Sequence, residues 1–334
     1  MVVHVGHGTW LVIDSFVGPN KIPAAIRYLN EIGVEPAQSV ALVAATHWHD
    51  DHIQGIAQIL ELCPSAEFCC SAALQSEEFL KLVGRSEKNH FSGSGSGLRE
   101  FYRVFSYLYE KRRSPKYAIA NRKILVSNQC EVWSLSPDDS YFQKFLSSIS
   151  NMFLQKGEDK LRLSNITPNE ISVVFWITCG KIKILLGADL EKKGWTIILS
   201  NSTRPTGKAS LFKVPHHGSK NAYEPMMWQQ MLIEKPYSVV APWSLGGNVL
   251  PSQQDATRIL KQTPRAWITK NQPLKPTSPA HKKKALERTL REGGTRMYPL
   301  TKTSFVRLRR PIDSSSDWNA ETFGAACHLS EYSV

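Results

Sequence analysis

The sequence lacks a long apolar run. Its most apolar stretch, ISVVFWIT at residues 171–178, is short and contains a serine and a threonine. A membrane-spanning helix needs about 20 apolar residues. The opening residues MVVHVGHGTW have neither a basic n-region nor a cleavage-like site. We therefore expect no transmembrane helix and no signal peptide, and we expect a cytoplasmic protein.

Cysteine is sparse and is not arranged as a metal-binding motif. None of the cysteines has the C-x-x-C spacing, and the adjacent pair Cys69–Cys70 would point to opposite faces of a strand. We expect all of them to be reduced thiols, most of them in the core of a cytosolic protein. They are Cys63, Cys69, Cys70, Cys130, Cys179 and Cys327.

Acidic residues are almost missing from one segment. Residues 261–310 hold fourteen Lys or Arg and only two acids, which accounts for the whole net charge of +12. Such a cluster attracts polyanions such as nucleic acid, and it makes their binding salt-dependent. Lys282, Lys283 and Lys284 lie in a basic helix expected at 280–292 and could steer nucleic acid to a site. The alternative is a solvated surface that only aids solubility.

The 334 residues are 42% hydrophobic, enough for one large α/β domain. Strand and helix patterns alternate, and polar clusters follow several apolar strands, as expected for two packed sheets with helices outside. We predict a domain over 1–310 that includes a flexible Gly/Ser loop near 88–98 and the basic segment 261–310. We predict that residues 311–334 form a loose polar tail.

The stretch THWHDDH, residues 46–52, predicts a metal site. His47 and His49 are two apart at the end of an apolar strand, so both imidazoles point to one side. Asp51 and His52 follow where the chain can fold back to the same point. Imidazole and carboxylate are the ligands that Zn²⁺ and similar ions take in the absence of thiolates. We expect Asp50 to be a solvated loop residue.

Two later strands end in residues of the same chemistry. Asp189 follows the apolar strand ILLG, where it could bridge two metal ions or cap the helix that begins at LEKKGW. His216 and His217 follow another apolar strand in VPHHGS; the alternative is an ordinary pair of loop histidines. Since α/β proteins build sites at the carboxyl ends of strands, we expect these clusters to meet.

These motifs resemble the metallo-β-lactamase superfamily. The order of VGHGTWLVID, LSP, NEISVVF, LLGADLE and VPHHGS over about residues 1–310 is similar to one branch. This branch is the metallo-β-lactamase domain of ComEC-type DNA-uptake proteins and their stand-alone relatives. The resemblance implies a four-layer αβ/βα sandwich of two mixed β-sheets flanked by helices. It also implies one or two divalent ions, Zn²⁺ or Mn²⁺, between the sheets.

The resemblance further implies that Asp14 orients the site loop by hydrogen bonding. We expect Asp51 to hold the attacking water while ligating. Ser219 and Lys220, just after the histidine pair, could contact phosphate, unless they are ordinary loop residues. His217 would contact substrate and is the second choice as a ligand. The implied metal ligands are His47, His49, Asp51, His52, Asp189 and His216.

Two positions depart from the branch. Only His90 lies between the first motif and Asp189, beside the flexible loop, so the first metal lacks its usual third histidine. Asn169, in an N-x-x-S motif, is expected to occupy that part of the site and face substrate. Leu250 precedes Pro251 where the branch has a histidine, so one substrate contact is missing.

The sequence thus predicts a metal-dependent phosphodiesterase or nuclease. A divalent ion lowers the pKa of its bound water, which can then attack phosphorus. One alternative is a hydrolase of a small molecule such as a lactone, thioester, phosphocholine or cyclic nucleotide. Another is a partner subunit that keeps the fold with an impaired site.

Overall fold

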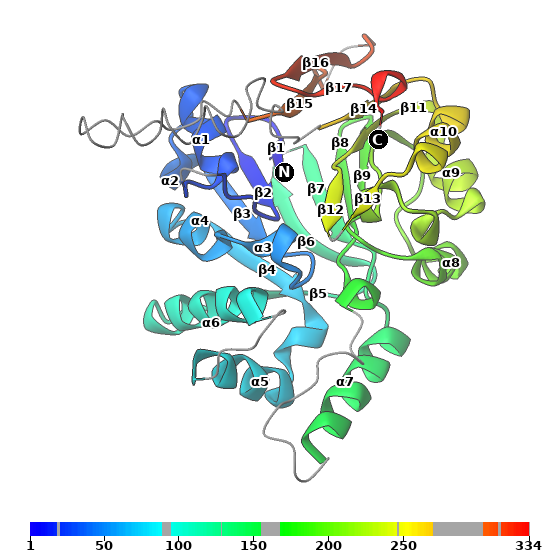
Figure 1. The fold of residues 1–334 in the computed structure, drawn as a ribbon. Helices are drawn as coiled ribbons and strands as arrows, with labels where there is room; N and C mark the ends of the chain where they lie inside the picture. Colours follow the sequence, from blue (N-terminus) through cyan, green and yellow to red (C-terminus); the bar gives the residue numbers. More distant parts are fainter. Residues whose placement is uncertain are drawn as a thin grey trace, which may run out of the picture.

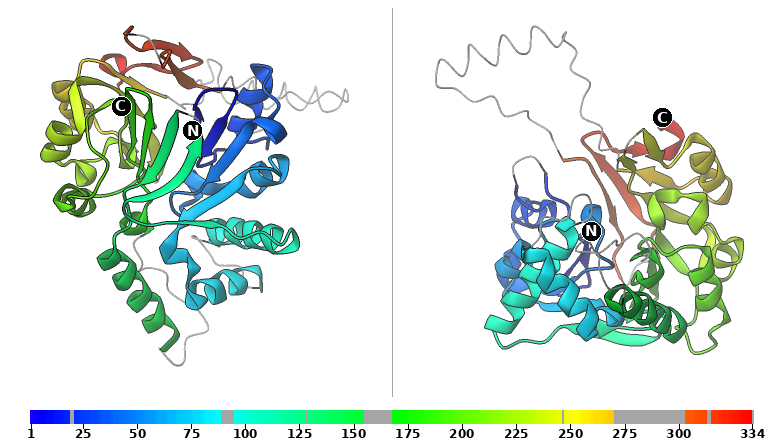
Figure 2. Two further views of the ribbon diagram at one scale, coloured as in Figure 1. Left: turned by 180° about the vertical axis from the view of Figure 1, so that it is seen from behind. Right: turned by 60° about the horizontal axis from the view of Figure 1, so that its bottom comes forward.

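The structure is a computed structural model. It describes residues 1–18, 21–88, 95–127, 129–154, 168–245, 247–269, 303–312 and 315–333. Two sheets lie face to face in its middle, and helices cover the outer face of each (Figures 1 and 2). This arrangement confirms the α/β fold class that the sequence predicts. No helix of the described residues is long and apolar enough to cross a membrane.

The first sheet is built from the N-terminal part of the chain. Its order is β1-β2-β3-β4-β5; β1 is antiparallel to β2, and the remaining neighbours are parallel. The strands are β1 (Val2–His4), β2 (Trp10–Ile13), β3 (Val40–Ala44), β4 (Glu67–Ser71) and β5 (Lys116–Ala118).

The second sheet is mixed and larger, with the order β17-β14-β11-β10-β9-β8-β7-β6. Strands β9, β10, β11 and β14 are parallel, and the strands outside them pair antiparallel. They are β6 (Arg122–Ser127), β7 (Cys130–Ser134), β8 (Phe175–Cys179), β9 (Ile182–Leu186), β10 (Ala209–Lys213), β11 (Leu232–Val240), β14 (Ala266–Ile268) and β17 (Cys327–His328). Two hairpins stand apart, β12 (Trp243–Leu245) with β13 (Asn248–Leu250) and β15 (Phe305–Arg309) with β16 (Asn319–Phe323).

Helices from the first half of the chain cover the first sheet, and α8–α10 cover the second (Figure 1). The α-helices are α1 (Ala24–Glu31), α2 (Pro36–Ser39), α3 (Asp50–Ile53), α4 (Ile56–Leu62), α5 (Glu77–Lys88), α6 (Gly95–Glu110), α7 (Asp139–Leu154), α8 (Lys192–Ser200), α9 (Pro225–Met231) and α10 (Gln253–Gln262). The 3-10 helices are η1 (Ala72–Gln75), η3 (Pro168–Ile171), η4 (His216–Gly218), η5 (Lys220–Ala222) and η6 (Leu329–Glu331).

The core has three parts, one at each interface of the four layers. In β2, Val12 packs toward the outer helices, whereas Leu11 and Ile13 pack between the sheets. In β8, Trp176 faces the helices of the second half, and Phe175 packs between the sheets. Alternate residues of a strand point to opposite faces, so strands buried on both faces need continuous apolar runs. This explains why these strands read as unbroken hydrophobic segments.

The C-terminal residues are more ordered than the sequence suggests. The expectation of a loose tail over 311–334 is wrong for its described residues, which contribute β16, β17 and η6. Trp318 packs between the sheets, and Leu329 and Tyr332 pack with the core under α10. Isolated apolar residues in a polar segment carry no periodic signal, although they bury well once the sheets present a surface.

One pair of cysteines is oxidised, contrary to the expectation of six thiols. Cys130 and Cys179 form a disulfide, and they are directly opposite one another on the antiparallel strands β7 and β8. The expectation failed because the residues are 49 apart in sequence and only strand register brings them together. Cys63, Cys69 and Cys70 are free thiols, as expected.

Several expected features lie outside the described residues. These are His90, most of the Gly/Ser loop, and the basic helix at 280–292 with Lys282, Lys283 and Lys284.

Candidate metal centre

The candidate site forms where four strands end. Asp14 follows β2, the THWHDDH motif follows β3, Asp189 follows β9, and the His216–His217 pair follows β10. The pairs β2/β3 and β9/β10 are each parallel, so both members end at the same edge of their sheet. The two sheets face one another, and their polar strand ends therefore meet (Figure 1).

The first group of ligand-type residues contains His47, His49 and Asp189. One nitrogen or oxygen of each lies within 4.8 Å of the others. His47 Nε2 is 2.9 Å from His49 Nδ1 and 4.0 Å from Asp189 Oδ2. His47 and Asp189 are almost completely buried, so any ion bound there would be shielded from solvent.

The second group contains Asp51, His52 and His217. Their ligand atoms also lie within 4.8 Å of one another. His217 Nε2 is 3.2 Å from Asp51 Oδ2 and 3.4 Å from Asp189 Oδ2, and His52 Nε2 is 3.3 Å from Asp189 Oδ1. Asp189 thus faces both groups and has the position of a bridging carboxylate.

Hydrogen bonds fix which nitrogen three of the histidines present. Thr46 Oγ1 donates its one hydrogen to Asp14 Oδ2 at 3.0 Å, so His47 Nδ1, 3.1 Å away, donates to Thr46 Oγ1. His52 Nδ1 donates to Asp14 Oδ2 at 2.8 Å, and His217 Nδ1 donates to the Ala241 carbonyl at 2.9 Å. Each ring therefore turns its Nε2 toward the site, as metal-binding histidines commonly do.

Two buried polar atoms of the site fit a bound metal ion. His52 Nε2 and Asp189 Oδ1 lie 3.3 Å apart, and neither makes a hydrogen bond to any described residue. Buried polar atoms are nearly always satisfied, so such atoms call for an explanation. Imidazole nitrogens and carboxylate oxygens suit Zn²⁺ and Mn²⁺. The two groups would hold one or two such ions, with Asp189 shared between them.

Burial and neighbouring charges shift the pKa values of the site residues, for His52 and Asp189 in opposite directions. Burial alone would lower the pKa of His52, but the carboxylates of Asp189 and Asp14 outweigh it and raise that pKa to about 10. Burial would raise the pKa of Asp189, but His52 and His217 hold it well below its usual value. Burial keeps the pKa of His47 well below 6.5, so His47 is neutral and ready to ligate.

Asp14 accepts hydrogen bonds from two residues of the THWHDDH motif, Thr46 and His52. Besides its bonds to the Thr46 hydroxyl and to His52, its Oδ1 accepts the backbone N–H of Thr46 at 2.8 Å. This is the loop-orienting position that the resemblance implies. Thr46 itself was not singled out from the sequence, although it directly precedes the first histidine of the motif.

His217, and not His216, lies with the candidate metal ligands of the second group. The sequence analysis favours His216 as the ligand, whereas the structure places His217 in the second group. His216 instead lies near the polar side chains of Asn169 and Glu191, at 3.5 Å and 3.7 Å. Both histidines have left-handed backbone conformations, with φ of 47° and 53°, so strand alternation does not continue through them. This turn directs the second imidazole into the site.

The residues expected to contact substrate differ from one another in burial and in their hydrogen-bond partners. Asn169 lies in η3 and its Nδ2 donates to Glu191 Oε1 at 3.3 Å. Ser219 is buried and caps the start of η5, because its Oγ accepts the backbone N–H of Asn221. Lys220 is exposed. Leu250, at the end of β13, is half-buried.

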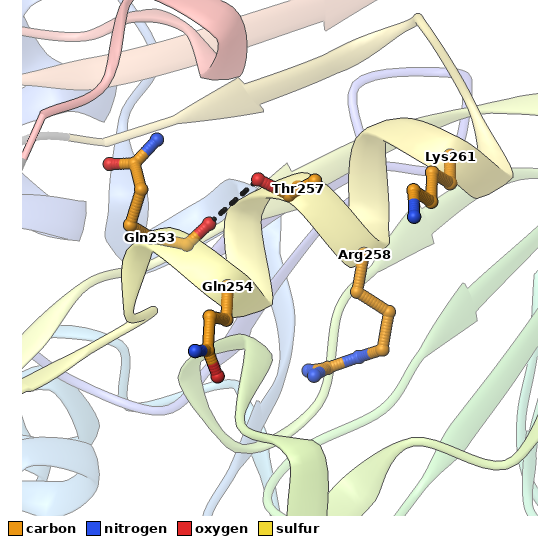
Figure 3. Close-up of a pocket in the computed structure, with 5 residues that line it drawn as sticks. All are labelled: Gln253, Gln254, Thr257, Arg258 and Lys261. Atoms are coloured by element: carbon orange, nitrogen blue, oxygen red, sulfur yellow. Dashed lines mark hydrogen bonds between the residues drawn. The ribbon is translucent and has the colours of Figure 1, made fainter.

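Figure 3 shows the side chains of α10 that line a surface hollow. Its lining residues are Gln253, Gln254, Thr257, Arg258 and Lys261. None of them belongs to either metal-ligand group.

The family comparison agrees with the motif. Residues 1–90 match the model of the Metallo-beta-lactamase superfamily. The matched region carries five residues of the candidate site, Asp14, His47, His49, Asp51 and His52, whereas Asp189 and His217 lie beyond it. A search of curated protein sequences gives no match.

Several solved structures are similar to the chain. A metallo-beta-lactamase motif mutant from Cronobacter sakazakii is 12% identical, with a TM-score of 0.34 and coverage of 62% of this chain and 69% of that one. The metallo-beta-lactamase fold protein YhfI from Bacillus subtilis is 12% identical, with a TM-score of 0.31 and coverage of 62% and 58%. Zn²⁺-bound PqqB from Methylobacterium extorquens is 13% identical, with a TM-score of 0.33 and coverage of 64% and 57%. The chain thus spans less than two thirds of YhfI and of PqqB.

Proposed function

We propose that this protein is a divalent-metal-dependent hydrolase of phosphodiesters and that its substrate is nucleic acid. The observation that carries the proposal is Asp189, whose carboxylate lies close to both ligand groups. Its Oδ2 is 4.0 Å from His47 of the first group and 3.4 Å from His217 of the second, and its Oδ1 is 3.3 Å from His52 of the second. When bound at such a site, divalent ions activate a water molecule and neutralise charge that builds on a phosphate. Three histidines that present Nε2 and carboxylates on both sides supply the needed ligands.

Solvent exposure supports a direction of approach to the site. The Asp51 side chain is 34% exposed, whereas that of Asp189 is 3% exposed. Substrate would therefore enter from the Asp51 side. In this proposal Asp51 orients the attacking water, and Asp14 keeps His52 in place and its Nε2 free.

Charge supports a phosphodiester rather than a neutral ester. The whole excess of +12 lies in residues 261–310, and Lys220 is exposed just after the histidine pair. Positive charge raises the local concentration of a polyanion and makes binding salt-dependent. The order of motifs that resembles ComEC-type domains supports the same substrate class.

The test is metal analysis combined with a cleavage assay on the full chain. Single- and double-stranded DNA and RNA are incubated with the protein and Mn²⁺ or Zn²⁺, and bound metal is counted after dialysis. Asp189→Asn and His47→Ala should lose metal and cleavage, whereas His4→Ala, an exposed histidine in β1, should keep both. A wild-type protein that binds metal but cleaves none of the four substrates would overturn the substrate class. Metal content unchanged in both site variants would overturn the site.

A further inference from the structure

The loop that carries His217 is attached to α10 by one side chain. Arg258 Nη2 donates to the carbonyl oxygen of Gly218 at 2.8 Å, and Gly218 directly follows His217. The same guanidinium contacts Asp255 Oδ1 at 2.7 Å. Asp255 is itself fixed by Ser252, whose backbone N–H and hydroxyl both donate to Asp255 Oδ2. A chain of contacts therefore runs from the start of α10 to the metal loop.

The loop and the helix also pack closely at this point. Gly218 has a φ of +82°, and a Cβ there would lie 3.0 Å from Ile259 Cδ1 and 3.3 Å from Pro251 Cβ. The Arg258 guanidinium lies over the ring of Tyr223, 5.0 Å from its centroid. Figure 3 shows Gln254 and Arg258 projecting from the same side of α10. Arg258 is thus held between helix and loop, with 21% of its side chain exposed.

The left-handed turn through His216 and His217 makes the placement of the metal loop dependent on such an anchor. Two successive non-glycine residues with positive φ are conformationally costly, and they persist only where surrounding contacts determine them. His217 has two such contacts, its own bond to the Ala241 carbonyl and the stacked ring of Trp243 at 6.2 Å. The Arg258 hydrogen bond holds the carbonyl group of Gly218, the residue after His217. It therefore restricts the backbone rotation that would turn His216 instead of His217 into the site.

We propose that Arg258 is a positioning residue that sets the metal affinity of the Asp51, His52 and His217 group. It acts through the Gly218 carbonyl and touches neither metal nor substrate. The inference rests on the proposed metal site and adds a residue more than 200 positions from the THWHDDH motif in sequence. Partners outside the ligand set typically change metal affinity by about 10- to 100-fold when they are removed.

The experiment compares Arg258→Met with Lys261→Met in the full chain. Both variants lose one positive charge from α10, but Lys261 is exposed and lines the same surface hollow, one turn further along the helix. Zn²⁺ affinity is measured by competition with a chromophoric chelator, and the absorption spectrum of the Co²⁺-loaded protein reports the ligand geometry. Arg258→Met should weaken Zn²⁺ binding at least about 10-fold and alter the Co²⁺ spectrum, whereas Lys261→Met should change neither.

Arg258→Lys separates positioning from folding. It keeps the charge and an N–H donor but not the planar guanidinium that lies over Tyr223 and places Nη2 between the Gly218 carbonyl and Asp255, so an intermediate Zn²⁺ affinity is expected. It also serves if Arg258→Met does not fold, as judged by circular dichroism. Equal affinity and spectra in all folded variants would overturn the role of Arg258 and leave the metal site standing. A wild-type protein that binds no Zn²⁺ or Co²⁺ would overturn the proposed function and this inference together.

Discussion

Asp14 combines an unusual backbone with a full set of side-chain bonds. Its φ of +58° lies in the left-handed region, which aspartate and asparagine enter more readily than most residues. From there its two oxygens reach the Thr46 backbone, the Thr46 hydroxyl and His52. A residue outside the ligand set thereby determines the orientation of two ligands.

Asp14→Asn should weaken metal binding while the fold is kept. Asparagine tolerates the same backbone conformation, but its amide group would point N–H toward the His52 or Thr46 donors. We expect a loss of about 10- to 100-fold in Zn²⁺ affinity, measured by chelator competition. Asp50→Asn, at an exposed position of the same motif, is the matched control and should bind normally. Equal affinities for the two variants would contradict the role given to Asp14.

The neighbouring histidines provide a second test at the residue scale. His217→Ala should remove a ligand and lower the amount of metal bound per chain, because His217 Nε2 lies between Asp51 and Asp189. His216→Ala should keep the metal, because His216 faces Asn169 and Glu191. Metal content after dialysis distinguishes them. The reverse result would restore the order that the sequence analysis expects.

At the scale of elements, α10 has the clearest local stabilisation. Ser252 and Asp255 form a capping box, in which each side chain bonds the backbone N–H of the other. Such a box satisfies N–H groups that have no partner within the helix. It also places Asp255 beside Arg258, so helix capping and loop anchoring share one carboxylate.

Asp255→Asn should destabilise the protein in a pH-dependent way. Burial alone would raise the pKa of Asp255, but hydrogen bonds from Ser252 and Arg258 outweigh it and lower that pKa below 3.8. A carboxyl group with a lowered pKa contributes stability above its unfolded pKa and loses it as the pH falls through the folded value. Urea unfolding should show a cost of about 1 kcal/mol at pH 7. The difference between variant and wild type should shrink below about pH 4, and a constant difference would contradict this account.

At the scale of the whole molecule, the C-terminal residues close the sandwich. The hairpin β15–β16 lies at the top of Figure 1, across the ends of both sheets. Trp318, just before β16, packs between the sheets and donates its indole N–H to Ser210 Oγ at 3.1 Å. Residues more than 100 positions apart thus share one core.

Trp318→Ala should lower the free energy of unfolding by about 3 kcal/mol, because it removes a large side chain from a packed interface. Leu245→Ala is the control, since this side chain is 68% exposed and its loss should cost no more than about 0.5 kcal/mol. Both values can be measured by chemical denaturation. A cost for Trp318→Ala as small as that of the control would show that the segment is a loose tail after all.

Local signals in the sequence were enough to predict many of the strands and a candidate metal site. Continuous apolar runs predict strands such as β3 and β9, and ligand-type residues at their ends predict a metal site. The tertiary structure decided what depends on pairing over long distances. It selected His217 over His216 through two left-handed residues, joined Cys130 to Cys179 through strand register, and brought Arg258 to Gly218. Spacing along the chain encodes none of these, since each follows from how separately formed elements pack.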